Sequence, residues 1–196
     1  MKKAELRKLY LEKRASLSGQ NVAEMSGLIA EQFFENVDVA AVKMLHSFIP
    51  IRKFNEVDTE LIVRRIWLEF PDIVTAAPRT DLDTGTFESV TFGPTTELVE
   101  NSWGIREPPG GEQITPVEIA LVIVPLLCFD TNRHRVGYGK GMYDRFLATC
   151  RRDVLKVGVS LFQPVEPIED RNLYDVPLDI CITPLKTYFL NKKGCC

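Results

Sequence analysis

Apolar side chains recur at helical spacing in three segments near the start of the chain. Residues 3–16 are rich in Lys, Arg and Glu, and their apolar positions share one side of a helix. Ser18 can cap a second helix, and Asp58 or Thr59 can open a third. The apolar positions predicted to face a core are, in order, Leu6, Leu9 and Tyr10; Val22, Met25, Ile29 and Phe33; and Leu61, Ile62, Ile66 and Trp67.

Short apolar runs predict strands between and after these helices. Residues 119–124 read Ile-Ala-Leu-Val-Ile-Val, a continuous run that suits a strand buried on both faces of a parallel sheet. The segment before it, residues 79–117, is rich in Gly, Pro, Thr and Asp and holds one predicted hairpin. The other predicted strands are residues 42–48, which end near Pro50, residues 73–77, closed by Pro78, and residues 155–161 and 179–183.

Strands and helices alternate along the chain, and this order favours an α/β fold with a layered, mostly parallel sheet flanked by helices. The 196 residues suit one hydrophobic core. We therefore expect a single domain over residues 1–190, with residues 191–196 as a loose tail.

Composition narrows the classes of function. The net charge of −3 argues against a protein that mainly contacts nucleic-acid phosphates. The charged start of the chain lacks the apolar core of a signal peptide, and no apolar run approaches the roughly 18 residues of a membrane span. The five cysteines form no CxxC pair, as in a reduced cytoplasmic protein. We expect a cytoplasmic protein that binds neither nucleic acid nor membrane.

The segment after the strand at 119–124 carries the most unusual pattern. Gly137, Gly139 and Gly141 alternate, so that backbone amides can approach a ligand without Cβ interference. Arg133, Arg135 and Lys140 surround them, and a helix that begins near residue 142 adds its partial positive charge. Ligands of open α/β sheets bind beyond the carboxyl ends of the strands, so this segment is a candidate phosphate cradle.

The glycine pattern leaves alternatives open. It is not a Walker A loop, because Gly141 stands where that loop needs Ser or Thr, and it is not the dinucleotide GxGxxG pattern. A plain Gly-rich turn with solvated charges is the other interpretation. Asp144, on the first turn of the helix that follows, can bind Mg²⁺ beside phosphate oxygens or simply offset the helix dipole.

The same segment resembles a known signature. Phe129-Asp130 and Arg135-Val-Gly-Tyr-Gly-Lys-Gly-Met-Tyr-Asp-Arg145 are similar to FD-x-x-G-x-R-L-G-x-G-x-G-Y-Y-D-R of the 5-formyltetrahydrofolate cyclo-ligase family. Further matching segments, in the family's order, are Lys3-Ala-Glu-Leu-Arg7, Glu56-Val-Asp-Thr-Glu60, Pro78-Arg79, Ser102-Trp103-Gly-Ile105 and Tyr174-Asp175. The resemblance covers residues 3–184. It departs from the family at Arg133, where glycine is usual, and at Met142, where tyrosine is usual.

The resemblance implies a fold similar to the NagB/RpiA/CoA transferase-like proteins and an ATP-dependent conversion of 5-formyltetrahydrofolate to 5,10-methenyltetrahydrofolate, with release of ADP and phosphate. It implies that ATP is held by Lys3, Arg7, Arg135, Val136, Gly137, Tyr138, Gly139, Lys140, Gly141, Met142 and Tyr143. It assigns the folate to Ile51 (or Pro50), Glu56, Trp103, Tyr138, Gly139, Lys140, Gly141 and Met142, and Mg²⁺ to Asp144 and Asp175. Arg135 and Lys140 are the predicted catalytic residues, because they can hold charge that develops on the transferred phosphoryl group.

Each assignment has a plainer alternative. Lys3 and Arg7 suit a solvated basic helix, Glu56 a surface carboxylate, Trp103 core or rim packing, and Asp175 the cap of a turn. His46 is interpreted as structural and His134 as a weak phosphate contact. A sugar-phosphate isomerase or CoA transferase, which uses no ATP, and a regulator that binds both ligands without reaction are the competing functions. We expect a monomer or weak homodimer.

Overall fold

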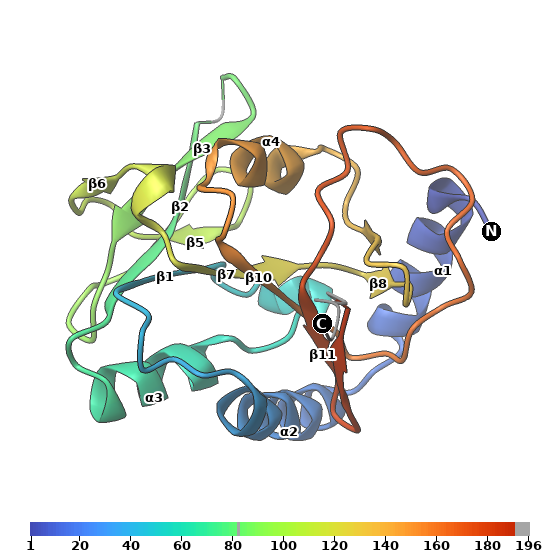
Figure 1. The fold of residues 1–196 in the computed structure, drawn as a ribbon, viewed down its shortest axis with the longest axis horizontal. Helices are drawn as coiled ribbons and strands as arrows, with labels where there is room; N and C mark the ends of the chain where they lie inside the picture. The colour runs from blue at the N-terminus through green and yellow to red at the C-terminus, as the bar shows by residue number, and fades with distance from the viewer. Residues whose placement is uncertain (82, 191–196) are drawn as a thin grey trace, which may run out of the picture.

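The computed structural model describes residues 1–81 and 83–190, and their longest sheet has eight strands (Figure 1). The order across this sheet is β12-β11-β10-β7-β1-β2-β3-β6. Strands β11, β10, β7, β1 and β2 are parallel to one another, whereas the pairs β12–β11, β2–β3 and β3–β6 are antiparallel. The strands are β1 (Met44–Ser47), β2 (Val74–Asp81), β3 (Thr86–Thr91), β6 (Gln113–Ile114), β7 (Leu121–Pro125), β10 (Leu155–Val159), β11 (Ile180–Ile182) and β12 (Thr187–Phe189). Two small ribbons stand apart, β4 (Val99–Glu100) with β5 (Arg106–Glu107) and β8 (Cys128–Phe129) with β9 (Arg135–Val136).

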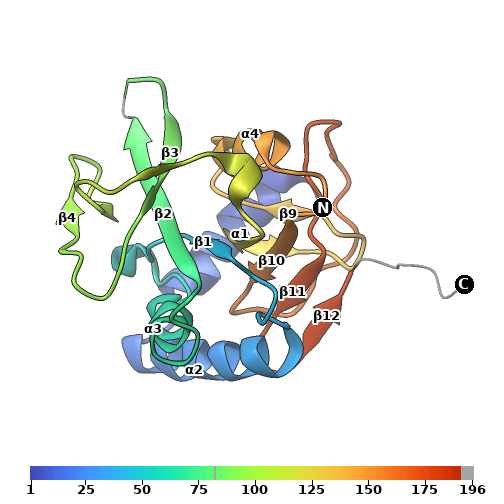
Figure 2. The ribbon, with the colours of Figure 1, turned by 60° about the vertical axis from the view of Figure 1, so that its left-hand side comes forward.

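Helices cover both faces of the sheet. The helices α2 (Gly19–Asn36) and α3 (Glu60–Glu69) lie on one face, and α4 (Met142–Thr149) lies on the other (Figures 1 and 2). Side chains of β7 alternate between the two resulting cores, since Leu121 and Ile123 pack with α2 and α3 whereas Val122 and Val124 pack with α4. The prediction of an α/β fold with a centrally buried strand is confirmed. The further likeness to the NagB/RpiA/CoA transferase-like fold stays a prediction.

The first helix, α1 (Lys3–Ala15), packs away from both cores. Leu6 and Tyr10 are buried against the β8–β9 ribbon, where Val136 and Ile168 complete a third apolar cluster. The ribbon follows β7 directly, so α1 comes to lie beside the segment that carries the glycine pattern. Of the helices in the described ranges, none combines the length and the apolar character that a membrane span needs.

Side-chain caps explain where the next two helices begin. The Ser18 hydroxyl accepts a hydrogen bond from the Asn21 N–H at 3.1 Å, as its position predicts. For α3, the N-cap residue is Thr59, whose hydroxyl donates to the Phe48 carbonyl, and Asp58 before it accepts from the Glu60 N–H at 3.1 Å instead.

The buried side of α3 differs from the prediction at two positions. Its buried residues are Ile62, Val63 and Ile66, whereas Leu61 is 39% exposed and Trp67 is half-buried. The prediction that Leu61 faces the core is therefore wrong. The helix begins at Glu60, and Val63 rather than Leu61 shares a side with Ile62 and Ile66.

The prediction that Pro78 closes the second strand is also wrong. Strand β2 continues through Pro78 to Asp81 and pairs with β3 along that length. Its pairing with β1 ends at Ala76, so the proline ring faces a side where no ladder hydrogen bond is lost. The Thr80 N–H, two residues further and therefore on the same side, donates to the Glu107 carboxylate instead.

From the centre of the sheet, successive strands are added toward both edges. The chain proceeds from β1 to β2 on one side and from β7 to β10 and β11 on the other. The neighbouring strands β1 and β7 therefore mark a topological switch point, where ligands of open α/β sheets bind beyond the carboxyl ends.

Candidate functional site

A cleft of about 770 Å³ opens beyond the carboxyl ends of β1 and β7. Phe48, Ile49 and Pro125 come from those strand ends, and the rest of the lining comes from segments far apart in the chain. These segments are the start of α1, residues 51–56, parts of β2 and β3 (Pro78, Thr80 and Phe87), residues 103–107, residues 135–144 and residues 170–175. The volume is that of a small-molecule or cofactor site.

The cleft collects nearly all of the residues predicted from the sequence. Its lining includes Lys3, Arg7, Ile51, Glu56, Trp103, Arg135, Gly137, Tyr138, Gly139, Lys140, Gly141, Met142, Tyr143, Asp144 and Asp175. Val136 is the exception among the predicted ATP-binding residues. Its side chain is 1% exposed and packs under α1, and its carbonyl accepts from the Leu127 N–H, so Val136 is corrected to a core residue.

Three cations of the cleft already have partners. Lys3 hydrogen-bonds and ion-pairs with Asp175, and Arg135 forms an ion pair of 2.8 Å with Asp144. The Arg7 Nε donates to the Gly137 carbonyl at 2.9 Å, which fixes the guanidinium against the glycine segment. Lys3 and Arg7 thus face the cleft, and the alternative of a merely solvated basic helix does not describe them.

Two of the glycines are required by geometry. Gly139 has φ +96°, and a Cβ at this position would meet the Arg7 guanidinium at 3.0 to 3.2 Å. Gly141 has φ +64° and immediately precedes α4, so the chain turns into the helix through a left-handed residue. These positions place the backbone of residues 137–141 close to Arg7 and to the start of α4.

Lys140 and Trp103 meet across the cleft. The Lys140 Nζ lies 3.7 Å from the centre of the Trp103 ring, in a cation–π contact. Lys53 also donates to the Trp103 carbonyl at 3.1 Å, and this hydrogen bond connects the backbone at Trp103 to the segment that follows β1. Trp103 is therefore a wall of the cleft, and the alternative of core packing is wrong.

Glu56 is 7% exposed and accepts two hydrogen bonds. Its Oε2 accepts from the Ile51 N–H at 2.8 Å, and its Oε1 accepts from the Tyr138 hydroxyl at 2.6 Å. Burial raises the pKa of the Glu56 carboxyl, while these hydrogen bonds and the charge of Arg14 oppose that rise. The alternative of a surface carboxylate is thus excluded.

The two candidate metal-binding carboxylates flank Arg135. Asp144 accepts from Arg135 and from the Val176 N–H through Oδ1, and Asp175 accepts from Lys3 and from the Asn172 N–H through Oδ2. Burial would raise the pKa of Asp175, but the hydrogen bonds from Lys3 and Asn172 outweigh it and hold that pKa below its usual value. Across residues 1–81 and 83–190, no group of three or more His, Cys, Asp or Glu could hold a metal ion by itself. A cation here needs oxygen ligands from a bound substrate in addition to the two carboxylates.

The turn after Asp130 is preserved despite Arg133. Arg133 has φ +79°, the left-handed conformation in which glycine is favoured. Its side chain donates to the Leu178 carbonyl at 2.9 Å and reaches Asp179 at 3.1 Å, contacts that a glycine could not make. His134 lies 3.3 Å from Asp130 and does not line the cleft, so the expectation that it contacts phosphate is wrong.

Some cleft residues were missed by the sequence reasoning. Glu107 is 5% exposed and accepts from both the backbone and the hydroxyl of Thr80. It lies two residues after the matching segment Ser102-Trp103-Gly-Ile105, and the resemblance gave it no role. Phe87 and Asn172 also line the cleft, but nothing in their own sequence context distinguishes them.

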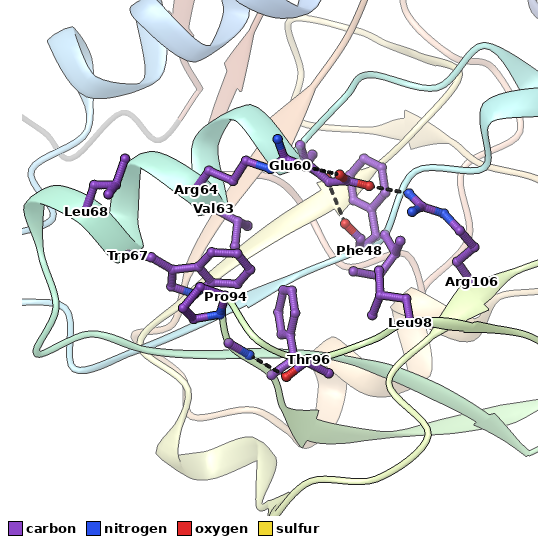
Figure 3. A pocket seen from close by; sticks show the side chains of 14 residues that line it. Phe48, Glu60, Val63, Arg64, Trp67, Leu68, Pro94, Thr96, Leu98 and Arg106 are labelled. Atoms are coloured by element: carbon purple, nitrogen blue, oxygen red, sulfur yellow. Dashed lines mark hydrogen bonds and ion pairs between the residues drawn. The ribbon is translucent and has the colours of Figure 1, made fainter.

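A second cavity, of about 530 Å³, lies on the other side of Phe48 and Ile49, between α3 and residues 92–98 (Figure 3). Trp67 packs edge-on against Phe92, and its indole N–H donates to Thr75 at 2.8 Å. Glu60 lies between Arg64 and Arg106 and forms an ion pair with each. The polar groups of this cavity are thus engaged with one another, and its remaining lining is mainly apolar.

Comparison with known proteins gives one consistent result. The family model described as "5-formyltetrahydrofolate cyclo-ligase family" matches residues 1–184. The chain is 29% identical to the 5-formyltetrahydrofolate cyclo-ligase of Mycoplasma genitalium over 91% of this chain and 97% of that protein, and 27% identical to that of Escherichia coli K12 over 90% and 97%. The solved structure of Aquifex aeolicus 5,10-methenyltetrahydrofolate synthetase superposes with a TM-score of 0.80 at 26% identity, covering 100% of this chain and 96% of the other.

Proposed function

The chain belongs to the 5-formyltetrahydrofolate cyclo-ligase family, and from this we propose that it converts 5-formyltetrahydrofolate and ATP to 5,10-methenyltetrahydrofolate, ADP and phosphate. One observation of the structure carries the proposal. Lys3 and Arg7 from the first helix lie in the same cleft as residues 135–144 and face Glu56 and Trp103 within it.

The cleft suits two substrates side by side. The phosphates of ATP would lie against Lys3, Arg7, Arg135 and the glycine amides, where positive charge and N–H donors converge. The pterin would lie against the wall formed by Ile51, Glu56 and Trp103, with Trp103 stacking on the ring and Glu56 accepting from its N–H groups.

The reaction needs an activated formyl oxygen, because a formamide oxygen is a poor leaving group. The formyl oxygen attacks the γ-phosphorus, the bond from that phosphorus to the bridging oxygen breaks, and ADP leaves. The nitrogen at position 10 then attacks the formyl carbon and loses its proton to solvent, and the carbon–oxygen bond breaks to release phosphate. Lys140 and Arg135 would hold the charge that develops on the transferred group, while the cleft aligns the two substrates.

We also propose that Mg²⁺ accompanies the nucleotide. Asp144 and Asp175 are the chain's candidate ligands, and phosphate oxygens would complete a shell of the kind that Mg²⁺ takes. When bound, the ion would supply neutralisation of the phosphate charge. The expected monomer or weak homodimer and the cytoplasmic location remain predictions.

The direct test mixes purified protein with 5-formyltetrahydrofolate and Mg-ATP. The methenyl product is followed by its near-ultraviolet absorbance and ADP by a coupled assay. The expected result is one ADP for each methenyl product. Absence of product, or ADP formation that does not depend on folate, contradicts the proposal, and binding of both ligands without ADP release would select the regulator.

A further inference from the structure

We infer that Arg14, which does not line the cleft, is a positioning residue that holds Glu56 and Tyr138 ready for the folate. The inference rests on the proposed function and extends it to a residue for which neither the sequence pattern nor the resemblance supplied a role.

Arg14 is a buried cation near the end of α1. It is 3% exposed, although arginine is rarely buried without a specific set of partners. Its guanidinium donates to the Tyr138 hydroxyl at 2.9 Å and to the Leu126 carbonyl at 2.5 Å. The Leu126 carbonyl lies just beyond the end of β7, so Arg14 links α1 to the strand end that borders the cleft.

The hydrogen bonds from Arg14 continue into the cleft in one direction. The Tyr138 hydroxyl has one proton, and it donates that proton to Glu56 Oε1 at 2.6 Å while its oxygen accepts from Arg14. The Arg14 guanidinium also lies 3.8 Å from the same carboxylate oxygen. Arg14 therefore fixes the orientation of a tyrosine and a glutamate that both line the cleft.

The backbone carbonyl of Arg14 also restrains the turn at Asn55, directly before Glu56. The Asn55 side-chain amide donates to the Arg14 carbonyl at 2.9 Å and to the Leu17 carbonyl at 3.0 Å. Asn55 has φ +48°, and it immediately precedes Glu56. The end of α1 thus holds both the side chain of Glu56 and the turn that presents it.

A purely structural role explains these contacts less well. In the described part of the chain, the buried Arg14 Nε has no hydrogen-bond partner, so the guanidinium carries an unsatisfied donor. An apolar side chain could attach α1 to the β8–β9 ribbon without that cost, as Leu6 and Tyr10 already do. A cation is needed where a carboxylate must stay ionised although it is buried.

The groups around Glu56 determine how its ionisation, and with it the activity, depends on pH. They are Arg14 on α1, Tyr138 on the glycine segment, Tyr143 on α4 and the Ile51 N–H. Arg14 is the cation among them, so its removal should raise the pKa of Glu56 and reduce the ionised fraction. Since the ionised form accepts hydrogen bonds from the pterin, activity should then be lost at a higher pH as the solution is acidified.

The experiment compares Arg14→Met with wild type and with Lys8→Met, which removes an exposed cation from the same helix. For Arg14→Met we expect the KM for 5-formyltetrahydrofolate to rise about tenfold, with less than about a twofold change for ATP. The acid limb of kcat/KM for folate should move to higher pH, and Arg14→Lys should restore part of both effects. Lys8→Met should behave as wild type.

Two further measurements keep the result interpretable. If Arg14→Met does not fold, Tyr138→Phe, which interrupts the same chain of hydrogen bonds, should raise the KM for folate more than the KM for ATP. The carboxyl ¹³C shift of Glu56, followed in the protein without substrates, should titrate at higher pH in Arg14→Met or Arg14→Lys than in wild type. Equal changes in both KM values, or an unchanged Glu56 titration, would overturn the inference; a wild-type protein without turnover would instead refute the proposed function.

Discussion

Two cavities share the wall formed by Phe48 and Ile49, and they differ in how their charges are arranged. The cleft draws cations and carboxylates from segments at both ends of the chain, and they point into a common space. In the second cavity, Glu60 is paired with Arg64 and Arg106, and the remaining surface is mainly apolar. Size alone does not separate the two. Convergent polar groups from distant segments do, and they make the cleft the candidate reaction site.

The largest effect should come from Lys140→Ala in the cleft. Lys140 is exposed, so its loss should change the free energy of unfolding by no more than about 0.5 kcal/mol. If it stabilises the transferred phosphoryl group, kcat should fall about 10²- to 10³-fold. Steady-state turnover and urea unfolding of the same preparation measure the two effects.

Arg64→Ala is the matched control, because it removes a cation from the second cavity. We expect its kcat within about twofold of wild type, since Arg64 forms an exposed i,i+4 pair of small energetic weight. Equal losses of turnover in the two variants would abolish the distinction between the cavities.

Trp67→Ala should reverse the pattern expected for Lys140→Ala, with a loss of stability and no loss of activity. The substitution removes the edge-on contact with Phe92 and the hydrogen bond to Thr75. Because Trp67 is half-buried, we expect a loss of about 2 kcal/mol in the free energy of unfolding, with neither KM changed. A rise in the KM for folate would show that the second cavity communicates with the cleft.

His46 should make the free energy of unfolding depend on pH. It is fully buried on β1 beside Tyr143, and burial lowers its pKa to about 3 from an ordinary 6.5. The unfolded chain therefore binds a proton in this range that the folded protein does not, and stability should fall as the pH drops from 6.5 toward 3. The contribution should approach about 1.4 kcal/mol per pH unit. His46→Gln should flatten the slope in urea unfolding at several pH values, and an unchanged slope would contradict the assignment.

Apart from the Arg64→Ala control, Trp103→Ala should produce the smallest effect. Loss of one stacking surface should raise the KM for 5-formyltetrahydrofolate about fivefold. The KM for ATP should stay near wild type if Trp103 faces the pterin. A larger change in the KM for ATP would instead assign the indole to the nucleotide side.

The sequence predicted those parts of the molecule that depend on local pattern. Residues 121–124 of the predicted strand at 119–124 lie in the doubly buried β7, and Ser18 caps α2 as its residue type favours. Most of the cleft was predicted too, but through the resemblance, since a long motif specifies a site that isolated charges do not.

The errors share a physical cause. Where a strand ends and whether a side chain is buried depend on partners that are distant in sequence. Strand β2 passes through Pro78 because β1 has already ended beside it. Val136 lies within the motif, yet α1 covers it. The sequence pattern singled out no role for Arg14, and its burial depends on Tyr138 and Leu126, more than a hundred residues away.

The ion pairs of Lys3 with Asp175 and of Arg135 with Asp144 have a consequence for selectivity. Under the proposed function, a bare polyphosphate that bound Lys3 and Arg135 would break each pair and leave a carboxylate beside it without its cation. A nucleotide that carries a divalent ion would offer its phosphates to the cation of each pair and its metal ion to the carboxylate. The resting protein would thereby disfavour metal-free nucleotides and stray oxyanions through an exchange of partners, without any steric barrier.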